Sequence, residues 1–96
     1  MAARAPQEVA FAIRGPIART DLPGLCDRVC ALLAESGAQV AFCDVESVRS
    51  DAVTVDALAR LQLAARHHGC QVRLRGAAGE LRALIAFMGL DAVLAE

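Results

Sequence analysis

Two aspartates on either side of a short polar segment are the first residues that could do chemistry. Asp44 lies near the end of an apolar run, and Asp51 follows the polar residues 46–50. Two carboxylates at the carboxyl end of a strand could serve in acid–base catalysis or bind magnesium. However, Asp51 is also well suited to cap a helix that begins at residue 52, because its carboxylate can accept hydrogen bonds from free backbone N–H groups. We therefore interpret it as structural and expect no enzyme activity.

Cysteines and histidines could in principle bind a metal ion. Cys26 and Cys30 are four residues apart, so a helix would place them on one side, but His67, His68 and Cys70 belong to the far end of another predicted helix. Free cysteines usually behave as small buried hydrophobic residues. We predict reduced thiols in the core, solvated histidines, and no metal or other cofactor.

The composition argues against several kinds of partner. The 96 residues are 56% hydrophobic, carry a net charge of −1, and include no Trp or Tyr. Binding to nucleic acid through a basic surface or aromatic stacking is therefore not expected. No apolar run approaches the roughly 20 residues that a membrane-spanning helix needs, and the N-terminus lacks the apolar core of a signal peptide. We expect a cytoplasmic protein without direct membrane insertion.

Strand-like and helix-like segments alternate along the chain. Apolar runs predict strands at residues 9–13, 39–45 and 70–75; the second is apolar enough to be covered on both faces, and the third alternates like an edge strand. Helical spacing predicts helices from Thr20 or Asp21 to Gly37, from 52 to about 68, and from Glu80 to Gly89, before a last turn at 90–94. This order predicts an α/β fold: a small mixed, largely parallel sheet with helices packed against it.

The same spacing predicts which side chains face the core. The predicted inner faces are formed by Leu58, Leu61 and Ala65 in the second helix and by Leu81, Leu84, Ile85 and Met88 in the third. Phe87 lies beside the second of these stripes, and we place it at the edge of the core in preference to a partner contact. Arg73, Arg75 and Arg82 are expected to form a modest basic patch on a solvated face.

Four features of residues 40–94 occur in a fixed order. They are Phe-Cys-Asp-Val at 42–45, Asp51 opening a helix with Leu58 and Gly69 behind it, the strand at 72–75, and Glu-Leu-Arg at 80–82 followed by Met-Gly-Leu-Asp-Ala-Val-Leu at 88–94. In this order they resemble the STAS family, the sulfate-transporter and anti-sigma-factor-antagonist domain. Residues 9–37 fit the family more loosely. We predict a flexible N-terminus at residues 1–8 and a single STAS-like domain at 9–96.

The resemblance implies a binding surface at the start of the second helix. Its partner-binding residues would be Asp51, Ala52, Val53, Thr54 and Asp56. In family members that regulate sigma factors, an Asp-Ser-Ser-Gly type of motif stands here, and the Ser after the Asp is phosphorylated by an anti-sigma factor that is also a kinase. The corresponding run in this sequence is Asp-Ala-Val-Thr, so the phosphoacceptor position is Ala52, which has no hydroxyl. Ser50 and Thr54 could substitute, although a loop residue and a local capping group are the simpler interpretations.

Three functions remain open. The leading hypothesis is a bacterial regulatory module that resembles an anti-sigma factor antagonist. It would bind an anti-sigma factor with a histidine-kinase-like ATPase fold, and phosphorylation at the usual position would not switch it. The second is a STAS accessory subunit of a phospholipid-trafficking ABC transporter, bound to its ATPase subunit. The third, from another class, is a small-ligand binder or enzyme that uses Asp44, Asp51 and the cysteines.

Overall fold

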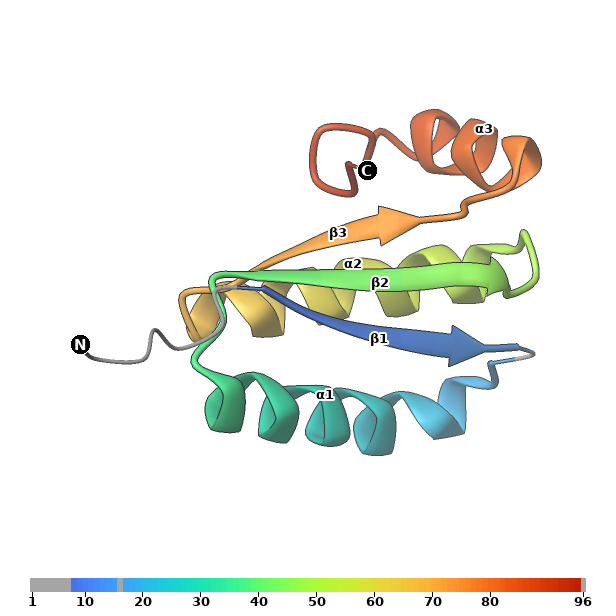
Figure 1. The fold of residues 1–96 in the computed structure, drawn as a ribbon. Helices are drawn as coiled ribbons and strands as arrows, with labels where there is room; N and C mark the ends of the chain where they lie inside the picture. The colour runs from blue at the N-terminus through green and yellow to red at the C-terminus, as the bar shows by residue number, and fades with distance from the viewer. Residues whose placement is uncertain (1–7, 16, 96) are drawn as a thin grey trace.

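Strands and helices alternate in the computed structural model, which describes residues 8–15 and 17–95 (Figure 1). In chain order the elements are β1 (Glu8–Arg14), the short 3-10 helix η1 (Arg19–Asp21), α1 (Leu22–Ser36), β2 (Val40–Ser47), α2 (Ala52–His67), β3 (Gln71–Arg75) and α3 (Gly79–Phe87). Each predicted strand and helix is present, with ends that differ by a few residues. The flexible N-terminus predicted at 1–8 lies outside the described residues except for Glu8, which opens β1.

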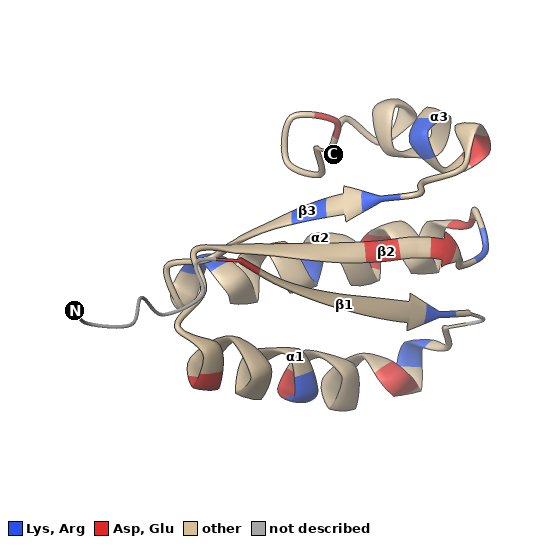
Figure 2. Cartoon of the chain, viewed as in Figure 1, with Lys and Arg blue, Asp and Glu red and all other residues tan. Residues whose placement is uncertain are grey.

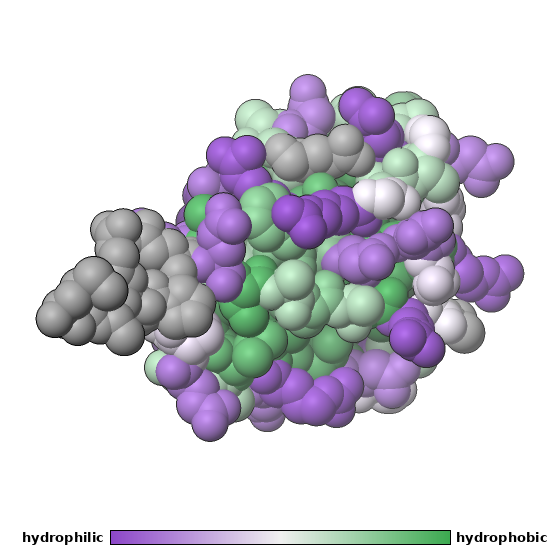
Figure 3. Space-filling model, in the orientation of Figure 1, coloured by the Kyte–Doolittle hydropathy of each residue, from purple (hydrophilic) through white to green (hydrophobic). Residues whose placement is uncertain are grey.

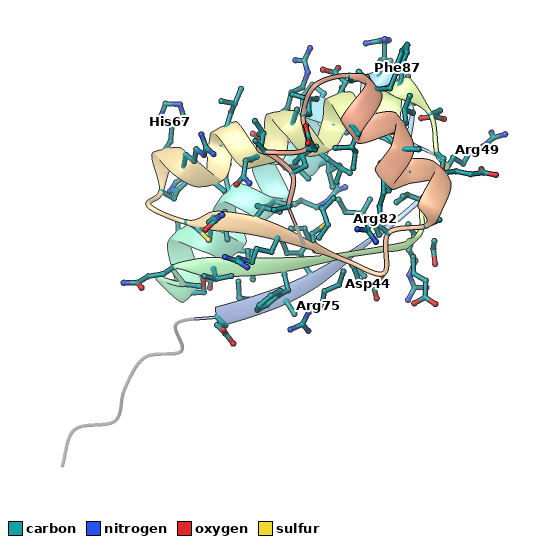
Figure 4. All side chains as sticks on the ribbon, turned by 90° about the horizontal axis from the view of Figure 1, so that it is seen from above. Asp44, Arg49, His67, Arg75, Arg82 and Phe87 are labelled. Carbon is teal, nitrogen blue, oxygen red and sulfur yellow. The ribbon has the colours of Figure 1, made fainter. Side chains whose placement is uncertain are left out.

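The three strands form one sheet in the order β1-β2-β3, and both neighbouring pairs are parallel. This confirms the predicted α/β class. Since the chain moves one place across the sheet at each crossover, α1 and α2 cover the same face (Figures 1 and 4). None of the described helices lies on the opposite face, and Figure 3 shows a band of hydrophobic surface across it, bordered by hydrophilic residues. Among the described residues, no helix is long and apolar enough to cross a membrane.

The prediction that β2 is covered on both faces is wrong. Its residues alternate, with Cys43 fully buried under the helices while Phe42 is half-buried and Asp44 is exposed on the open face. The physical reason is that both crossovers place their helices on one side. Phe42 is partly covered by another side chain instead, because the guanidinium of Arg75 lies 3.8 Å from the centre of its ring. Arg75 therefore packs on the sheet and is not simply solvated.

The core lies between the sheet and the helices. Leu58, Leu61 and Ala65 of α2 are fully buried, as predicted. The inner stripe of α3 is only partly as predicted, because Met88 is 40% exposed although Leu81 and Ile85 are buried.

Phe87 is 87% exposed, so its predicted place at the core edge is also wrong. The cause is the end of α3. Gly89 adopts φ +75°, which turns the chain so that the Leu90 N–H donates to the carbonyl of Ile85 at 2.9 Å. Leu94 then fills the core in place of the last residues of the helix.

A buried glutamine joins α2 to β3 and to the C-terminal segment. The Nε2 group of Gln62 donates to the carbonyls of Val72 (2.9 Å) and Val93 (2.8 Å), and its Oε1 accepts from the N–H of Val72 at 2.8 Å. Beside it, the N–H of Leu74 donates to the carbonyl of Ala95 at 3.0 Å. Gln62 thus hydrogen-bonds to the outer edge of β3 as a neighbouring strand would. It was not among the residues singled out from the sequence.

Replacing this side chain tests its contribution to stability. Gln62→Leu leaves the buried N–H and carbonyl of Val72 without their partner, so we expect the free energy of unfolding to fall by about 2–4 kcal/mol. Gln71→Leu makes the same chemical change at an exposed position of β3 and should cost less than about 0.5 kcal/mol. Urea denaturation followed by circular dichroism measures both. Equal effects of the two substitutions would contradict the structural role of Gln62.

Candidate functional site

The surface predicted from the sequence lies at the start of α2, next to the carboxyl end of β2. Asp51 has extended backbone angles (φ −134°, ψ 168°), and its Oδ1 accepts a hydrogen bond from the N–H of Thr54 at 2.8 Å. Asp51 is therefore the N-cap of α2, as predicted. This backbone hydrogen bond holds the pKa of the Asp51 carboxyl below its ordinary value.

The side chains of the first turn differ sharply in accessibility. Ala52 is exposed, and Asp51, Val53 and Asp56 are half-buried, so four of the five predicted residues reach the surface. Thr54 is 0% exposed. A kinase could reach its hydroxyl only after local unfolding of the helix start. Within the run 51–54, the exposed position that corresponds to the family phosphoacceptor is thus an alanine, and the hydroxyl of Thr54 points into the protein.

The flank of this surface is held by ion pairs. Oδ2 of Asp56 lies 3.1 Å from Nε of Arg60, one helical turn later, and 3.5 Å from a guanidinium nitrogen of Arg19 in η1. Both arginines are more than half exposed, so each pair contributes only about 0–1 kcal/mol. The pair with Arg19 joins η1 to α2, whereas the pair with Arg60 lies within α2. Figure 2 shows charges of both signs at this end of the molecule.

The second aspartate of the sequence faces elsewhere. Asp44 projects from the open face of the sheet, where its Oδ1 accepts from the N–H of Glu46 at 2.9 Å (Figure 4). The carboxylate of Asp51 accepts a hydrogen bond from the N–H of Thr54, and the carboxylate of Asp44 accepts one from the N–H of Glu46. Nothing in this arrangement provides a shared site for a substrate or a metal ion, and the absence of enzyme activity stays a prediction.

The four cysteines are free thiols. Cys43 and Cys70 are buried, as predicted. The prediction is wrong for Cys26 and Cys30, which lie on α1 and are only half-buried. Burial raises the pKa of the Cys43 thiol to about 12, and it also raises the pKa of Cys26 and of Cys70. Such thiols are poor nucleophiles at neutral pH.

No metal-binding cluster forms from these residues. In the part of the chain that the structure describes, no three His, Cys, Asp or Glu side chains come together closely enough to hold a metal ion. His67 and His68 are exposed at the end of α2, where we expected solvated residues.

An exposed aromatic residue belongs to the same side of the molecule as α2. Phe87 stands at the end of α3, which packs against α2, and Figure 4 shows it on the helix-covered side of the sheet. Leu63 of α2 is 60% exposed on the surface as well. Phe87 lies off the spacing of Leu81, Leu84 and Ile85, and this signal was available in the sequence. Exposed aromatic residues are enriched at protein–protein interfaces.

The fold is a parallel α/β domain with a capped, accessible helix start. Comparison with known families agrees: the family model described as "Mlab, STAS domain" matches residues 1–95. The chain therefore belongs to the STAS domain family, and the resemblance found in its sequence is confirmed. This family supports a regulatory or interaction role in general terms. A search of curated proteins found no match.

Because Asp51 caps α2 through a carboxylate, we expect its substitution to lower the stability of the fold in a pH-dependent way. Asp51→Ala should lower the free energy of unfolding by about 1 kcal/mol at pH 7, while Asp51→Asn, which can still cap, should cost less. Because the folded state lowers the pKa of Asp51, the carboxylate stabilises the fold above its unfolded pKa of about 3.9, and this contribution is lost as the pH falls through the folded pKa. The difference between wild type and Asp51→Asn should therefore shrink at acid pH. Urea titrations at neutral and acid pH measure it, and a pH-independent difference would contradict this assignment.

The burial of the cysteines predicts how fast each thiol is alkylated. Because a pKa near 12 leaves roughly a thousandfold less thiolate than a free thiol has, alkylation of Cys43 at pH 8 should require unfolding. The half-buried Cys30 serves as the internal comparison and should react first. Iodoacetamide labelling with and without urea, read by peptide mass spectrometry, measures both rates. Rapid labelling of Cys43 in the folded protein would restore the hypothesis of thiol chemistry.

Proposed function

We propose that this chain is a non-catalytic STAS interaction module that binds an ATPase partner through the start of α2, without a phosphorylation switch. One observation carries the proposal. The exposed position at the phosphoacceptor site is Ala52, and Thr54, the hydroxyl residue in the same helical turn, is fully buried. A phosphate would add about two negative charges beside the helix N-terminus and disturb a docked partner. This surface has no exposed hydroxyl at the phosphoacceptor position, so its binding is constitutive.

The surface has the parts that a protein interface needs. The small side chain of Ala52 lets a partner approach the helix start closely, and the half-buried Val53 adds apolar area. The arginines and aspartates around it, such as Arg19 and Asp56, form a charged rim that selects partners more than it adds affinity. Phe87, on the same side of the molecule, supplies an aromatic residue of the kind that dominates binding energies.

The first candidate partner is the ATPase subunit of a phospholipid-trafficking ABC transporter. An accessory subunit that steadies its ATPase has to stay bound through every cycle of the enzyme. Position 52 has no hydroxyl that a kinase could phosphorylate, so the start of α2 suits a partner that stays permanently bound. We therefore place the accessory subunit ahead of the regulator.

The second candidate is an anti-sigma factor with a histidine-kinase-like ATPase fold. It is supported by the retained Asp51 cap, because the family position that opens the binding helix is unchanged. In this case the chain would antagonise the anti-sigma factor without being inactivated by it, and its abundance would set the response.

Substitution of the exposed alanine tests the surface. Pull-down from the native cells with the wild-type chain, followed by mass spectrometry, identifies the ATPase, and calorimetry with the purified partner gives the affinity. Ala52→Arg should weaken binding by tenfold or more, on the order of the 1.4 kcal/mol that a blocked contact at an interface costs. Ala31→Arg, the same change at an exposed position of α1, should leave the affinity unchanged.

The possible outcomes separate the candidates. A transporter-type ATPase supports the first partner, and a histidine-kinase-like ATPase supports the second. Equal binding by wild type and Ala52→Arg would show that the start of α2 is not the docking surface. A phosphate recovered by mass spectrometry on Ser50 or Thr54 would contradict constitutive binding.

A further inference from the structure

The two outer strands of the sheet differ in how their edges are covered. The edge of β3 is closed by the amide of Gln62, which bonds to Val72, and by the carbonyl of Ala95, which bonds to Leu74. Within residues 8–15 and 17–95, no backbone or side chain hydrogen-bonds to the outer edge of β1. An uncovered edge of this kind is a template on which another strand can pair.

The orientation of the free backbone groups follows from one hydrogen bond. The N–H of Gly15 donates to the carbonyl of Ser47, on the β2 side of the strand, at 3.3 Å. The register with β2 shifts between Ala12 and Arg14, where three residues of β2 span two of β1. The extra residue is on β2, so β1 keeps its own alternation, and the N–H and C=O groups of residues 8, 10, 12 and 14 point away from β2. The side chains of these residues all lie on the open face and are exposed.

Charges at the two ends of β1 are opposite and symmetrically placed. Glu8 begins the strand and Arg14 ends it, as the red and blue ends of β1 in Figure 2 show. An antiparallel copy related by a two-fold axis at Phe11 would set each Glu8 opposite an Arg14 and each Ala10 opposite an Ala12. The same register pairs the outward N–H and C=O groups of both strands. A parallel copy in register would instead oppose Glu8 to Glu8, which is destabilising.

The helix side of this edge is open and only partly apolar. Between β1 and α1 lies a groove with a volume of about 600 Å³. Its lining includes Phe11, Ile17, Leu25, Val29 and Leu32, together with Arg28. Across the two-fold axis, Phe11 meets its counterpart as a non-hydrogen-bonded pair, in which side chains come closest. Aromatic cross-strand pairs of this kind stabilise a sheet, and each ring would cover part of the neighbouring groove.

We propose that the free edge of β1 is a homodimer interface, where β1 of a second copy adds in antiparallel orientation with Glu8 opposite Arg14. The dimer joins two three-stranded sheets into one continuous sheet. Backbone hydrogen bonds supply the pairing, the charges at the strand ends fix the register, and the phenylalanines close the groove. The paired strand residues 8–14 are different from those at the start of α2.

Charge reversal and charge exchange test the register. Sedimentation equilibrium across a range of concentrations should show a wild-type dimer. Glu8→Arg and Arg14→Glu should each raise the dissociation constant about tenfold or more, because each change turns two symmetric attractions into repulsions. The double variant, with both changes, restores opposite charges at each end and should recover the dimer. Glu80→Arg, the same reversal on α3, should leave it intact.

Three results would overturn the interface: a wild-type monomer at every concentration, single reversals without effect, or a double variant that fails to recover. Circular dichroism confirms that each variant is folded. A cross-link provides an independent measurement, since Cα atoms in a non-hydrogen-bonded pair are about 4.5 Å apart, within the range of a disulfide. Phe11→Cys should give a covalent dimer on oxidation, above the wild-type background, while Val9→Cys, whose counterpart is Ile13, should not. Equal cross-linking of the two would contradict the proposed axis.

Discussion

The buried amide of Gln62 holds together three parts of the molecule that are distant in the sequence. It donates to the carbonyls of Val72 in β3 and Val93 near the C-terminus, and it accepts from the N–H of Val72. A buried polar group is tolerated only when its hydrogen bonds are made, so this side chain determines how α2, β3 and the last residues sit together. The position of α2 in turn sets the direction in which its first turn, with Asp51 and Ala52, meets the solvent.

Much of the fold follows from local patterns in the sequence. Apolar runs separated by helical spacing predict the α/β order, and Gly37 ends α1 in the left-handed conformation that favours glycine. The single covered face of the sheet is not visible in such patterns, because the apolar run of β2 would suit a strand covered on either one side or two. Phe87 and Met88 were misplaced for a related reason. The chain returns after Gly89 and brings Leu94 into the space that the end of α3 would have filled.

The candidate site was predictable in part. The cap by Asp51 depends on neighbours three residues apart, and such short-range chemistry can be read from the sequence. The residues around the cap came from the family resemblance, and the loss of the phosphoacceptor at Ala52 was plain from the residue type. The burial of Thr54 was not predictable, since it depends on how the helix lies on the sheet. This burial leaves the first turn of α2 without an exposed hydroxyl.

The closure of β3 by residues near the C-terminus has a consequence for protein synthesis. Leu94 completes the core and Ala95 bonds to the edge of β3, so the domain lacks its last contacts until translation has passed residue 95. A growing chain that has not yet reached residue 95 leaves the edge of β3 at Leu74 without its backbone partner. Until that residue is in place, this edge is a target for chaperones and for mispairing with neighbouring nascent chains.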